Sequence, residues 1–194
     1  MAETPSTMLE LGTQAPAFEL PNMNKAAGAS TVSLSDYQDQ AVLVAFICNH
    51  CPYVVLITAK FAELAIEWQQ YGVNLVAICS NDIENYPADS PEKMIEFAQK
   101  NEFRFPYLYD ESQQVAKAYK AACTPDFFLF NSAHELVYRG QFDSARPANG
   151  QPVTGNDLDK AVKNLINGQT IEQNQIASVG CNIKWKAGNE PECG

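Results

Sequence analysis

The residues best suited to chemistry in this chain are two cysteines that flank a histidine, in the run Cys48-Asn49-His50-Cys51-Pro52. The run lies between a strand-like apolar stretch and a helical pattern. At the start of a helix, unpaired backbone N–H groups and the helix dipole stabilise negative charge, so a thiol there has a lowered pKa and reacts more readily. Two cysteines with this C-x-x-C spacing can also form a disulfide. The run therefore predicts thiol–disulfide chemistry at Cys48 and Cys51, with His50 supplying positive charge or a hydrogen bond to a sulfur.

Two other roles for this cysteine pair are open. Cysteine is often simply a small buried side chain, so both residues could be structural. A metal site is the other alternative, in which Cys48 and Cys51 supply two ligands and His50, Cys123 or Cys181 completes the set. The chain has only two histidines and no second pair of cysteines at this spacing. We therefore expect neither a bound metal nor another cofactor.

A second candidate element is Cys123-Thr124-Pro125, directly before an apolar run at residues 126–130. Proline can begin a strand because its missing N–H is not needed there. Two roles are open for Cys123, a third redox thiol or a small buried side chain. Cys181 is a candidate additional redox thiol, and it would reach the site only where the C-terminal segment folds back.

The elements around these residues alternate between strands and helices. Continuous apolar runs at residues 41–47 and 73–79 predict strands buried on both faces. Apolar residues at helical spacing predict four helices. The predicted order is a hairpin at residues 17–20 and 31–34, strand 41–47, a helix ending at Gly72, strand 73–79, a helix from Ser90, a short strand at 105–109, a helix capped by Asp110, a hairpin at 126–130 and 135–139, and a last helix from Thr154 to Gly168.

This order predicts an α/β fold with three layers. Alternating strands and helices imply parallel crossovers, whereas the late hairpin adds antiparallel strands, so the central sheet should be mixed and flanked by helices. The early hairpin would be an N-terminal extension. We expect a leader at residues 1–11, a single domain at residues 12–168 and an extended C-terminal tail at residues 169–194.

The composition limits the partners and the compartment. Of 194 residues, 46% are hydrophobic and the formal net charge is −10, which disfavours negatively charged nucleic acids and membranes as partners. The N-terminus lacks the basic start and apolar core of a signal peptide, and no stretch approaches the about 18 apolar residues of a membrane span. Six cysteines are too few for a disulfide scaffold at this length. We expect a cytoplasmic protein, with Cys79 in the core and Cys193 outside the site.

Several short phrases, in order, resemble the thioredoxin-like superfamily and its peroxiredoxin-like branch of redoxins related to AhpC/TSA. The resemblance spans residues 12–187 and implies a thioredoxin-like fold. The phrases are Pro-Ala-Phe-Glu-Leu at residues 16–20, Leu-Ser-Asp-Tyr at 34–37, the strand-to-helix junction at 41–52, Cys-Thr-Pro-Asp-Phe-Phe-Leu-Phe at 123–130, Tyr-Arg-Gly at 138–140 and Val-Gly-Cys-Asn-Ile-Lys-Trp at 179–185.

The resemblance also implies roles for these residues. By analogy with thioredoxins, Cys48 would be the attacking thiol and Cys51 the resolving thiol. Thr124 and Pro125 would form a cis peptide bond that packs beside both thiols and receives extended substrate backbone, with Cys123 next to them. The comparison with peroxiredoxins instead aligns Cys51 with their peroxidatic cysteine.

The match to peroxiredoxins is incomplete at the groups that assist peroxide chemistry. That branch has a proline seven residues before its peroxidatic cysteine and a threonine or serine three residues before it, where this chain has Val44 and Cys48. Its activating arginine has no counterpart at residues 121–123. Because such groups polarise the O–O bond and stabilise the leaving oxygen, their absence disfavours peroxidase activity.

The predicted function is therefore thiol–disulfide oxidoreduction. Cys48 and Cys51 would exchange a dithiol for a disulfide with protein or small-molecule disulfides, and another dithiol protein would supply electrons. A thiol peroxidase with Cys51 as the peroxidatic residue is one alternative. A metal-binding or metallochaperone protein that uses the same two cysteines is another.

Overall fold

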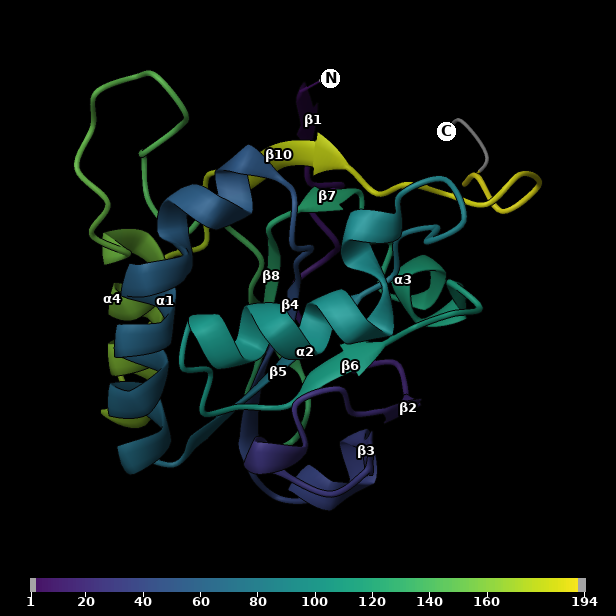
Figure 1. The fold of residues 1–194 in the computed structure, drawn as a ribbon. Helices are drawn as coiled ribbons and strands as arrows, with labels where there is room; N and C mark the ends of the chain where they lie inside the picture. The colour runs from purple at the N-terminus through teal and green to yellow at the C-terminus, as the bar shows by residue number, and fades with distance from the viewer. Residues whose placement is uncertain (1–2, 192–194) are drawn as a thin grey trace.

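The central sheet of the molecule has the strand order β6-β5-β4-β8-β9 (Figure 1). The computed structural model describes residues 3–191. The central strands are β4 (Ala41–Phe46), β5 (Val73–Cys79), β6 (Tyr107–Tyr109), β8 (Asp126–Phe130) and β9 (Leu136–Tyr138). β5 pairs in parallel with β4 and β6, whereas β8 pairs antiparallel with β4 and β9. The sheet is therefore mixed, as predicted.

Helices cover both faces of this sheet. They are α1 (Pro52–Gln70), α2 (Pro91–Lys100), α3 (Gln114–Ala118) and α4 (Asn156–Ile166). α1 and α4 lie side by side along one flank of the molecule, at the left of Figure 1. The predicted three-layer α/β architecture is confirmed.

Alternating residues of β4 separate two buried clusters. Leu43 and Ala45 point into a cluster that includes the apolar sides of α1, α2 and α4. Val42 and Val44 point into the other cluster, which includes α3 and the N-terminal hairpin. Because successive strand residues face opposite sides, a continuous apolar run is what a strand between two covered faces requires.

The N-terminal hairpin is present as predicted. β2 (Glu19–Pro21) pairs antiparallel with β3 (Thr31–Ser33). Short 3-10 turns, η1 (Lys25–Ala27) and η2 (Leu34–Tyr37), lie within and after the hairpin. A third turn, η3 (Pro87–Asp89), precedes α2.

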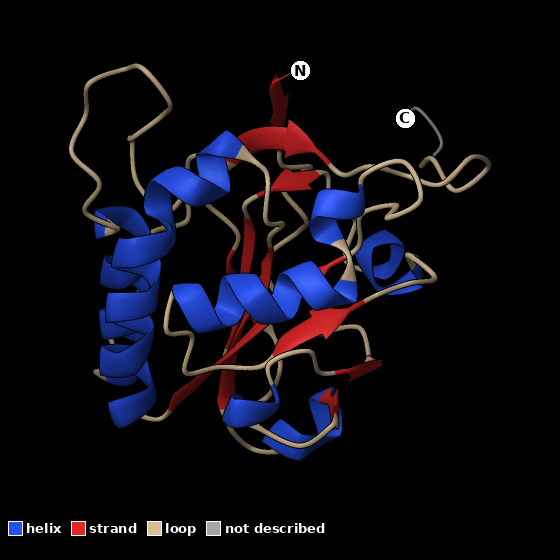
Figure 2. Ribbon diagram, in the orientation of Figure 1, coloured by secondary structure: helices blue, strands red, loops and turns tan. Residues whose placement is uncertain are grey.

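Three chain segments far apart in sequence meet in a separate sheet. β1 (Glu3–Pro5) pairs with β10 (Val179–Asn182), and β10 pairs with β7 (Cys123–Thr124), all antiparallel. These strands lie together at the top of Figure 2, near the start of α1. The segment expected as a leader thus carries a strand, and that strand pairs with the segment expected as a tail.

Two helices begin later than the sequence pattern predicts. Gln113 has a left-handed backbone with φ 63°, so α3 begins only at the following residue. Asp110 still accepts a hydrogen bond from the Ala116 N–H, at 2.9 Å, and so caps the helix from a distance. Gly155, with φ 69°, likewise delays α4, where Thr154 was the predicted cap.

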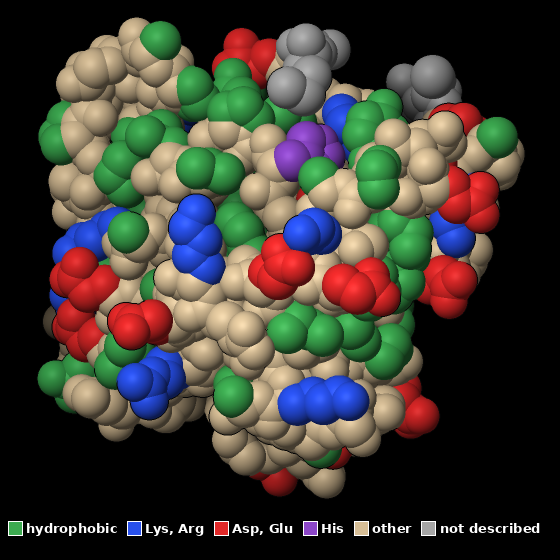
Figure 3. Space-filling model, in the orientation of Figure 1, with side chains coloured by type: hydrophobic (Ala, Val, Ile, Leu, Met, Phe, Trp, Pro, Cys, Tyr) green, Lys and Arg blue, Asp and Glu red, His purple; other side chains and the backbone are tan. Residues whose placement is uncertain are grey.

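Other features of the described residues concern the surface and the termini. No helix in residues 3–191 has the length and apolarity needed to cross a bilayer. Acidic and basic side chains are interspersed over the face shown in Figure 3, so neither sign dominates it. Cys193 lies outside the described residues.

Candidate functional site

The two cysteines of the first predicted element lie where β4 ends and α1 begins. Cys51 occupies the N-cap position with an extended backbone, and Pro52 is the first helical residue. Proline suits this position because its missing N–H would have no helical partner there. The Cys51 carbonyl accepts the first helical hydrogen bond from the Val55 N–H, at 2.9 Å. Both cysteines are enclosed, with 1% of Cys48 and none of Cys51 exposed.

The second predicted element packs directly against this pair. The Thr124–Pro125 peptide bond is cis, as the resemblance implies. The Cys48 Sγ lies 3.4 Å from the Thr124 Oγ1, and the Cys51 thiol donates to the Thr124 carbonyl oxygen at 3.1 Å. Residues separated by more than seventy positions in sequence therefore meet at two sulfur atoms.

Of the two sulfurs, that of Cys51 carries the negative charge more readily. A hydrogen bond from the Cys48 thiol has the largest effect, and together with hydrogen bonds from Cys181, Thr124 and the Val54 backbone it lowers the pKa of Cys51 to about 4 despite burial. The same hydrogen bond, together with burial, raises the pKa of Cys48. The Thr124 carbonyl oxygen can accept a hydrogen bond only from a protonated Cys51, so this contact opposes ionisation of Cys51. The several hydrogen bonds that Cys51 accepts outweigh this one contact. The pair is therefore a thiol and a thiolate in contact.

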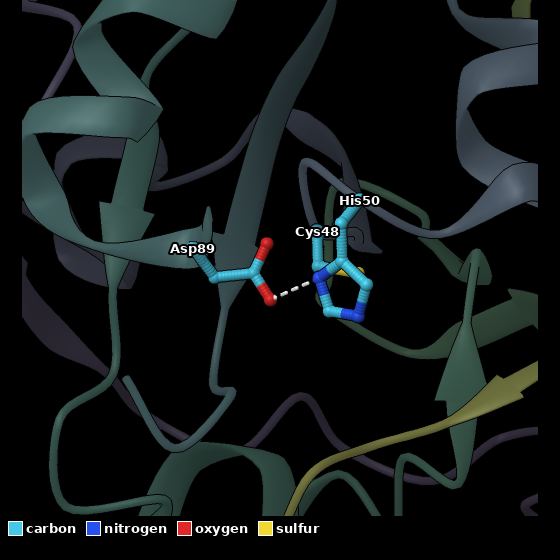
Figure 4. Close-up of side chains that lie close together, drawn as sticks. All are labelled: Cys48, His50 and Asp89. Atoms are coloured by element: carbon cyan, nitrogen blue, oxygen red, sulfur yellow. Dashed lines mark ion pairs between the residues drawn. The ribbon is translucent and has the colours of Figure 1, made fainter. Parts of the chain in front are cut away.

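His50 lies beside the cysteine pair and is held by a buried carboxylate. Its Nδ1 forms an ion pair with the Asp89 Oδ2 at 2.7 Å (Figure 4). Asp89, at the end of η3, is fully buried and also accepts from the Asn49 N–H and the Asn81 side chain, each at 2.8 Å. The hydrogen bond to Asp89 is the main reason that the pKa of His50 is raised, and the nearby Cys51 raises it further. The geometry thus favours the protonated form of His50 beside the thiolate.

Replacing His50 by glutamine should raise the pKa of Cys51 by about one unit, because the thiolate loses a nearby positive charge. The ultraviolet absorbance of the thiolate, followed during a pH titration of the reduced protein, measures this shift. Tyr86→Phe is the matched control, because it keeps the ring that stacks on His50, at 5.8 Å between centroids, and changes no charge. An unchanged titration midpoint in His50→Gln would show that the histidine does not act on Cys51.

Of the described cysteines outside the pair, Cys181 reaches it, whereas Cys79 and Cys123 make other contacts. Cys181, in β10, is hydrogen-bonded to Cys51, and burial together with this contact raises the pKa of Cys181 to about 12. Cys123 lies beside Thr124, but its thiol contacts the carbonyl oxygens of Pro125 and Ser178, at 3.6 and 3.9 Å. Burial also raises the pKa of Cys123. Cys79 is fully buried in the core, as expected.

Two charged residues near the site were not predicted to belong to it. Asp89 falls in a segment that the sequence pattern assigns only to a loop, and no motif links it to His50. Lys184 carries a charge of the kind usually found in solvent, but only 8% of it is exposed. Its ammonium group lies 5.5 Å from the ring centroid of Tyr86, and its charge lowers the pKa of both His50 and Cys181.

A second carboxylate, that of Asp126, is buried directly after the cis bond. It is fully enclosed, although an aspartate is ordinarily expected at the surface, and burial raises its pKa to about 7. Its Oδ2 accepts a hydrogen bond from the Ala122 N–H at 3.2 Å, which opposes part of that rise. Asp126 therefore keeps its proton in the folded protein over a pH range in which an exposed aspartate has lost it.

Replacing Asp126 by asparagine should change how stability depends on pH. Since the folded pKa is raised, the stability contributed by the wild-type carboxyl is present below about pH 4 and is lost as the pH rises through about 7. Relative to wild type, the variant should gain roughly 4 kcal/mol between these limits. Urea unfolding of both proteins near pH 4 and near pH 8 measures the difference. A difference that stays constant with pH would contradict the assignment.

One group of side chains in residues 3–191 has the geometry to hold a metal ion. Donor atoms of Cys48, His50 and Asp89 all lie within 4.8 Å of one another. Sulfur, nitrogen and carboxylate oxygen are all donors that zinc accepts. The set differs from the metal alternative considered from sequence, because Asp89 takes the place of the second cysteine. A protonated His50 paired with Asp89 would have to release its proton before either could bind a metal.

Solved structures of other proteins share this architecture. An uncharacterized conserved protein from Geobacillus kaustophilus has a TM-score of 0.91 and 48% sequence identity, covering 96% of this chain and 97% of that one. The thioredoxin domain of the thiol-disulfide oxidoreductase BVU-2223 from Bacteroides vulgatus has a TM-score of 0.60 and 17% identity, covering 79% of this chain and 99% of that one. The fold is thus thioredoxin-like, as the resemblance implies.

Sequence comparisons point in the same direction. A model described as the AhpC/TSA family matches residues 11–139. Peroxiredoxin Bcp from Escherichia coli K12 is 30% identical over 112 residues, which are 57% of this chain and 64% of that protein. Thiol-disulfide oxidoreductase ResA from Oceanobacillus iheyensis is 24% identical over 127 residues, 65% of this chain and 62% of that one. This chain therefore has relatives named for two different thiol chemistries.

Proposed function

The chain belongs to the AhpC/TSA family, and from that premise we propose that it is a thiol–disulfide oxidoreductase. In this proposal Cys48 and Cys51 alternate between a dithiol and a disulfide. The observation that carries it is the contact between a thiol and a thiolate at the start of α1, against Thr124 of the cis-proline loop. The name of the relative ResA, a thiol-disulfide oxidoreductase, supports the same chemistry.

In the proposed reaction Cys51 attacks first, because it is the ionised member of the pair. Its thiolate displaces one sulfur of a substrate disulfide, and that sulfur leaves as a thiolate. Cys48 then attacks the Cys51 sulfur of the mixed disulfide, and the second substrate thiol leaves with the electron pair of the broken bond. The proton of Cys48 passes to a departing thiolate. Two electrons have then moved from the protein to the substrate, and a dithiol donor would restore the reduced pair.

This order differs from the order implied by the resemblance, in which Cys48 attacks first. The difference rests on charge. Cys48 donates a hydrogen bond, and its pKa is raised, whereas Cys51 accepts hydrogen bonds and its pKa is lowered. Since the thiolate is the nucleophile, the ionised sulfur has the advantage.

Reduction of oxidised glutathione or insulin, with dithiothreitol as electron donor, tests the proposed activity. The wild-type protein should accelerate disulfide reduction above the rate of the donor alone. Cys51→Ser should abolish the acceleration, and so should Cys48→Ser in a Cys181→Ser background. Cys123→Ser serves as a control, because that thiol contacts the carbonyl oxygens of Pro125 and Ser178. Acceleration that survives both site substitutions would rule out the proposed reaction.

A second candidate is peroxide reduction at Cys51. It is favoured by the lowered pKa of Cys51, followed by Pro52 at the first helical position, and by the name of the relative peroxiredoxin Bcp. Stopped-flow mixing of the reduced protein with hydrogen peroxide distinguishes the two activities. A rate constant no higher than that of an ordinary thiolate supports disulfide exchange, whereas a rate constant several orders of magnitude higher would favour the peroxidase.

A further inference from the structure

Strand β10 occupies the edge of the cis-proline loop. Cys181 is paired with Thr124, and Asn182 with Cys123, in an antiparallel register. The resemblance assigns this edge to the extended backbone of a substrate, but here the chain's own C-terminal segment fills it. A role for this strand at the thiol pair rests on the proposed disulfide exchange and extends it.

Close backbone contact fixes the position of β10. A side chain at Gly180 would overlap the carbonyl oxygen of Thr124, so only glycine allows the approach. The Ser178 hydroxyl donates to the Pro125 carbonyl oxygen at 2.6 Å. β1 pairs along the opposite edge of β10, at Glu3 with Cys181. The strand is therefore held on both edges, with its cysteine opposite Thr124.

This placement brings a third sulfur atom, that of Cys181, into contact with the sulfur of Cys51. The thiols of Cys181 and Cys51 are hydrogen-bonded, and the Thr124 carbonyl oxygen that Cys51 contacts is also the atom against which Gly180 packs. Only 3% of Cys181 is exposed, so solvent does not separate the two sulfurs. Lys184, three positions further along the chain, adds a positive charge that favours ionisation of Cys181.

We propose that Cys181 is a third redox thiol, which exchanges with the Cys48–Cys51 disulfide to form a Cys51–Cys181 disulfide. The Cys181 sulfur attacks the Cys51 sulfur, the bond between Cys48 and Cys51 breaks, and its electron pair leaves on Cys48. The proton released by Cys181 is taken up by Cys48. One disulfide is exchanged for another, so the step needs no further oxidant. β10 thus acts as an internal substrate at the edge of Thr124.

The oxidation of Cys51 itself removes part of the barrier to this step. In the reduced protein the charge of Cys51 and the hydrogen bond to it contribute to holding the proton on Cys181. Once Cys51 is part of a disulfide it is neutral, and both contributions disappear. The positive charge of Lys184 remains, so Cys181 ionises more readily in the oxidised protein than in the reduced one.

The Cys48→Ser chain, oxidised with glutathione disulfide and mapped by mass spectrometry, tests this proposal. Glutathione first adds to Cys51, and Cys181 should then displace it to give an intramolecular Cys51–Cys181 disulfide. Cys48→Ser/Cys181→Ser should instead keep glutathione on Cys51. Cys48→Ser/Cys123→Ser is the matched control and should still form the disulfide. Glutathione retained on Cys51 in the single variant, with Cys181 still reduced, would overturn the proposal.

A backbone variant tests the role of β10 without removing a thiol. In the Cys48→Ser background, Gly180→Ala should slow formation of the Cys51–Cys181 disulfide at least about tenfold, because the added Cβ displaces β10 from Thr124. An unchanged rate would contradict the role given to the strand. The proposed function has a separate test, since it fails if the wild-type Cys48 and Cys51 never oxidise, whatever Cys181 does.

Discussion

Replacing Cys51 by serine lowers the rate of disulfide reduction by at least about 10³-fold, because a serine hydroxyl is not ionised at neutral pH and the site loses its nucleophile. The steady-state reduction of glutathione disulfide, with dithiothreitol as donor, measures the loss. Cys123→Ser provides the matched control. Its thiol lies one residue from Thr124 but contacts only carbonyl oxygens, so its rate should stay within about twofold of wild type. Retention of more than a tenth of the activity by Cys51→Ser would contradict the prediction.

A comparison of Cys48→Ser with Cys51→Ser determines which sulfur attacks first. In a Cys181→Ser background, Cys48→Ser should accumulate a mixed disulfide with glutathione on Cys51, because the resolving thiol is missing. Cys51→Ser in that background should accumulate little, since the remaining Cys48 thiol has a raised pKa. The reverse result, with a mixed disulfide only on Cys48, would restore the order implied by the resemblance to thioredoxins.

The second large effect is on the pH dependence of Cys51 reactivity. With its pKa lowered to about 4, Cys51 should react with iodoacetamide at nearly the same rate between about pH 6 and pH 8, whereas an ordinary thiol loses roughly a hundredfold over this range. Below about pH 4 the rate should fall tenfold per unit, since the thiolate becomes protonated. Mass spectrometry of peptides after timed alkylation measures each cysteine separately.

The burial of Cys51 and its pKa affect that pH profile in different ways. Burial limits access of the reagent to the Cys51 sulfur. The opening motion that admits the reagent scales the alkylation rate by the same factor at every pH, so the titration midpoint is unchanged. The urea-unfolded chain should return the midpoint to about 8.5, the usual value for a thiol. A midpoint near that value in the folded protein would mean that the contacts with Cys48 and Cys181 do not hold a thiolate.

The sequence was sufficient to predict the elements that carry the thiol pair. The apolar runs that form β4 and β5 are buried on both faces, and the pattern of α1 follows directly after Cys51. These signals are local, so a periodicity of a few residues reveals them. The position of Cys51 at the start of a helix, which the chemistry requires, follows from the same local pattern.

The contacts that tune the pair could not be predicted in this way. Asp89 reaches His50 from a separate loop. The strand that pairs with β7 is β10, which is short and contains a glycine and an asparagine. Neither interaction produces a periodic pattern of residues in the sequence, because each depends on how distant segments meet. From the sequence, Cys181 was a candidate redox thiol only where the C-terminal segment folds back. The pairing of β10 with Thr124 is what brings that thiol to Cys51.

A disulfide between Cys48 and Cys51 is the feature on which the proposed activity depends. Peptide mapping of the Cys181→Ser chain after equilibration with glutathione disulfide tests it most directly, because the competing thiol is absent. We expect one disulfide, between Cys48 and Cys51, with the loss of two thiols per chain and no retained glutathione. If both cysteines remain reduced, or if each retains glutathione separately, the two residues are not a redox pair and the proposed function is wrong.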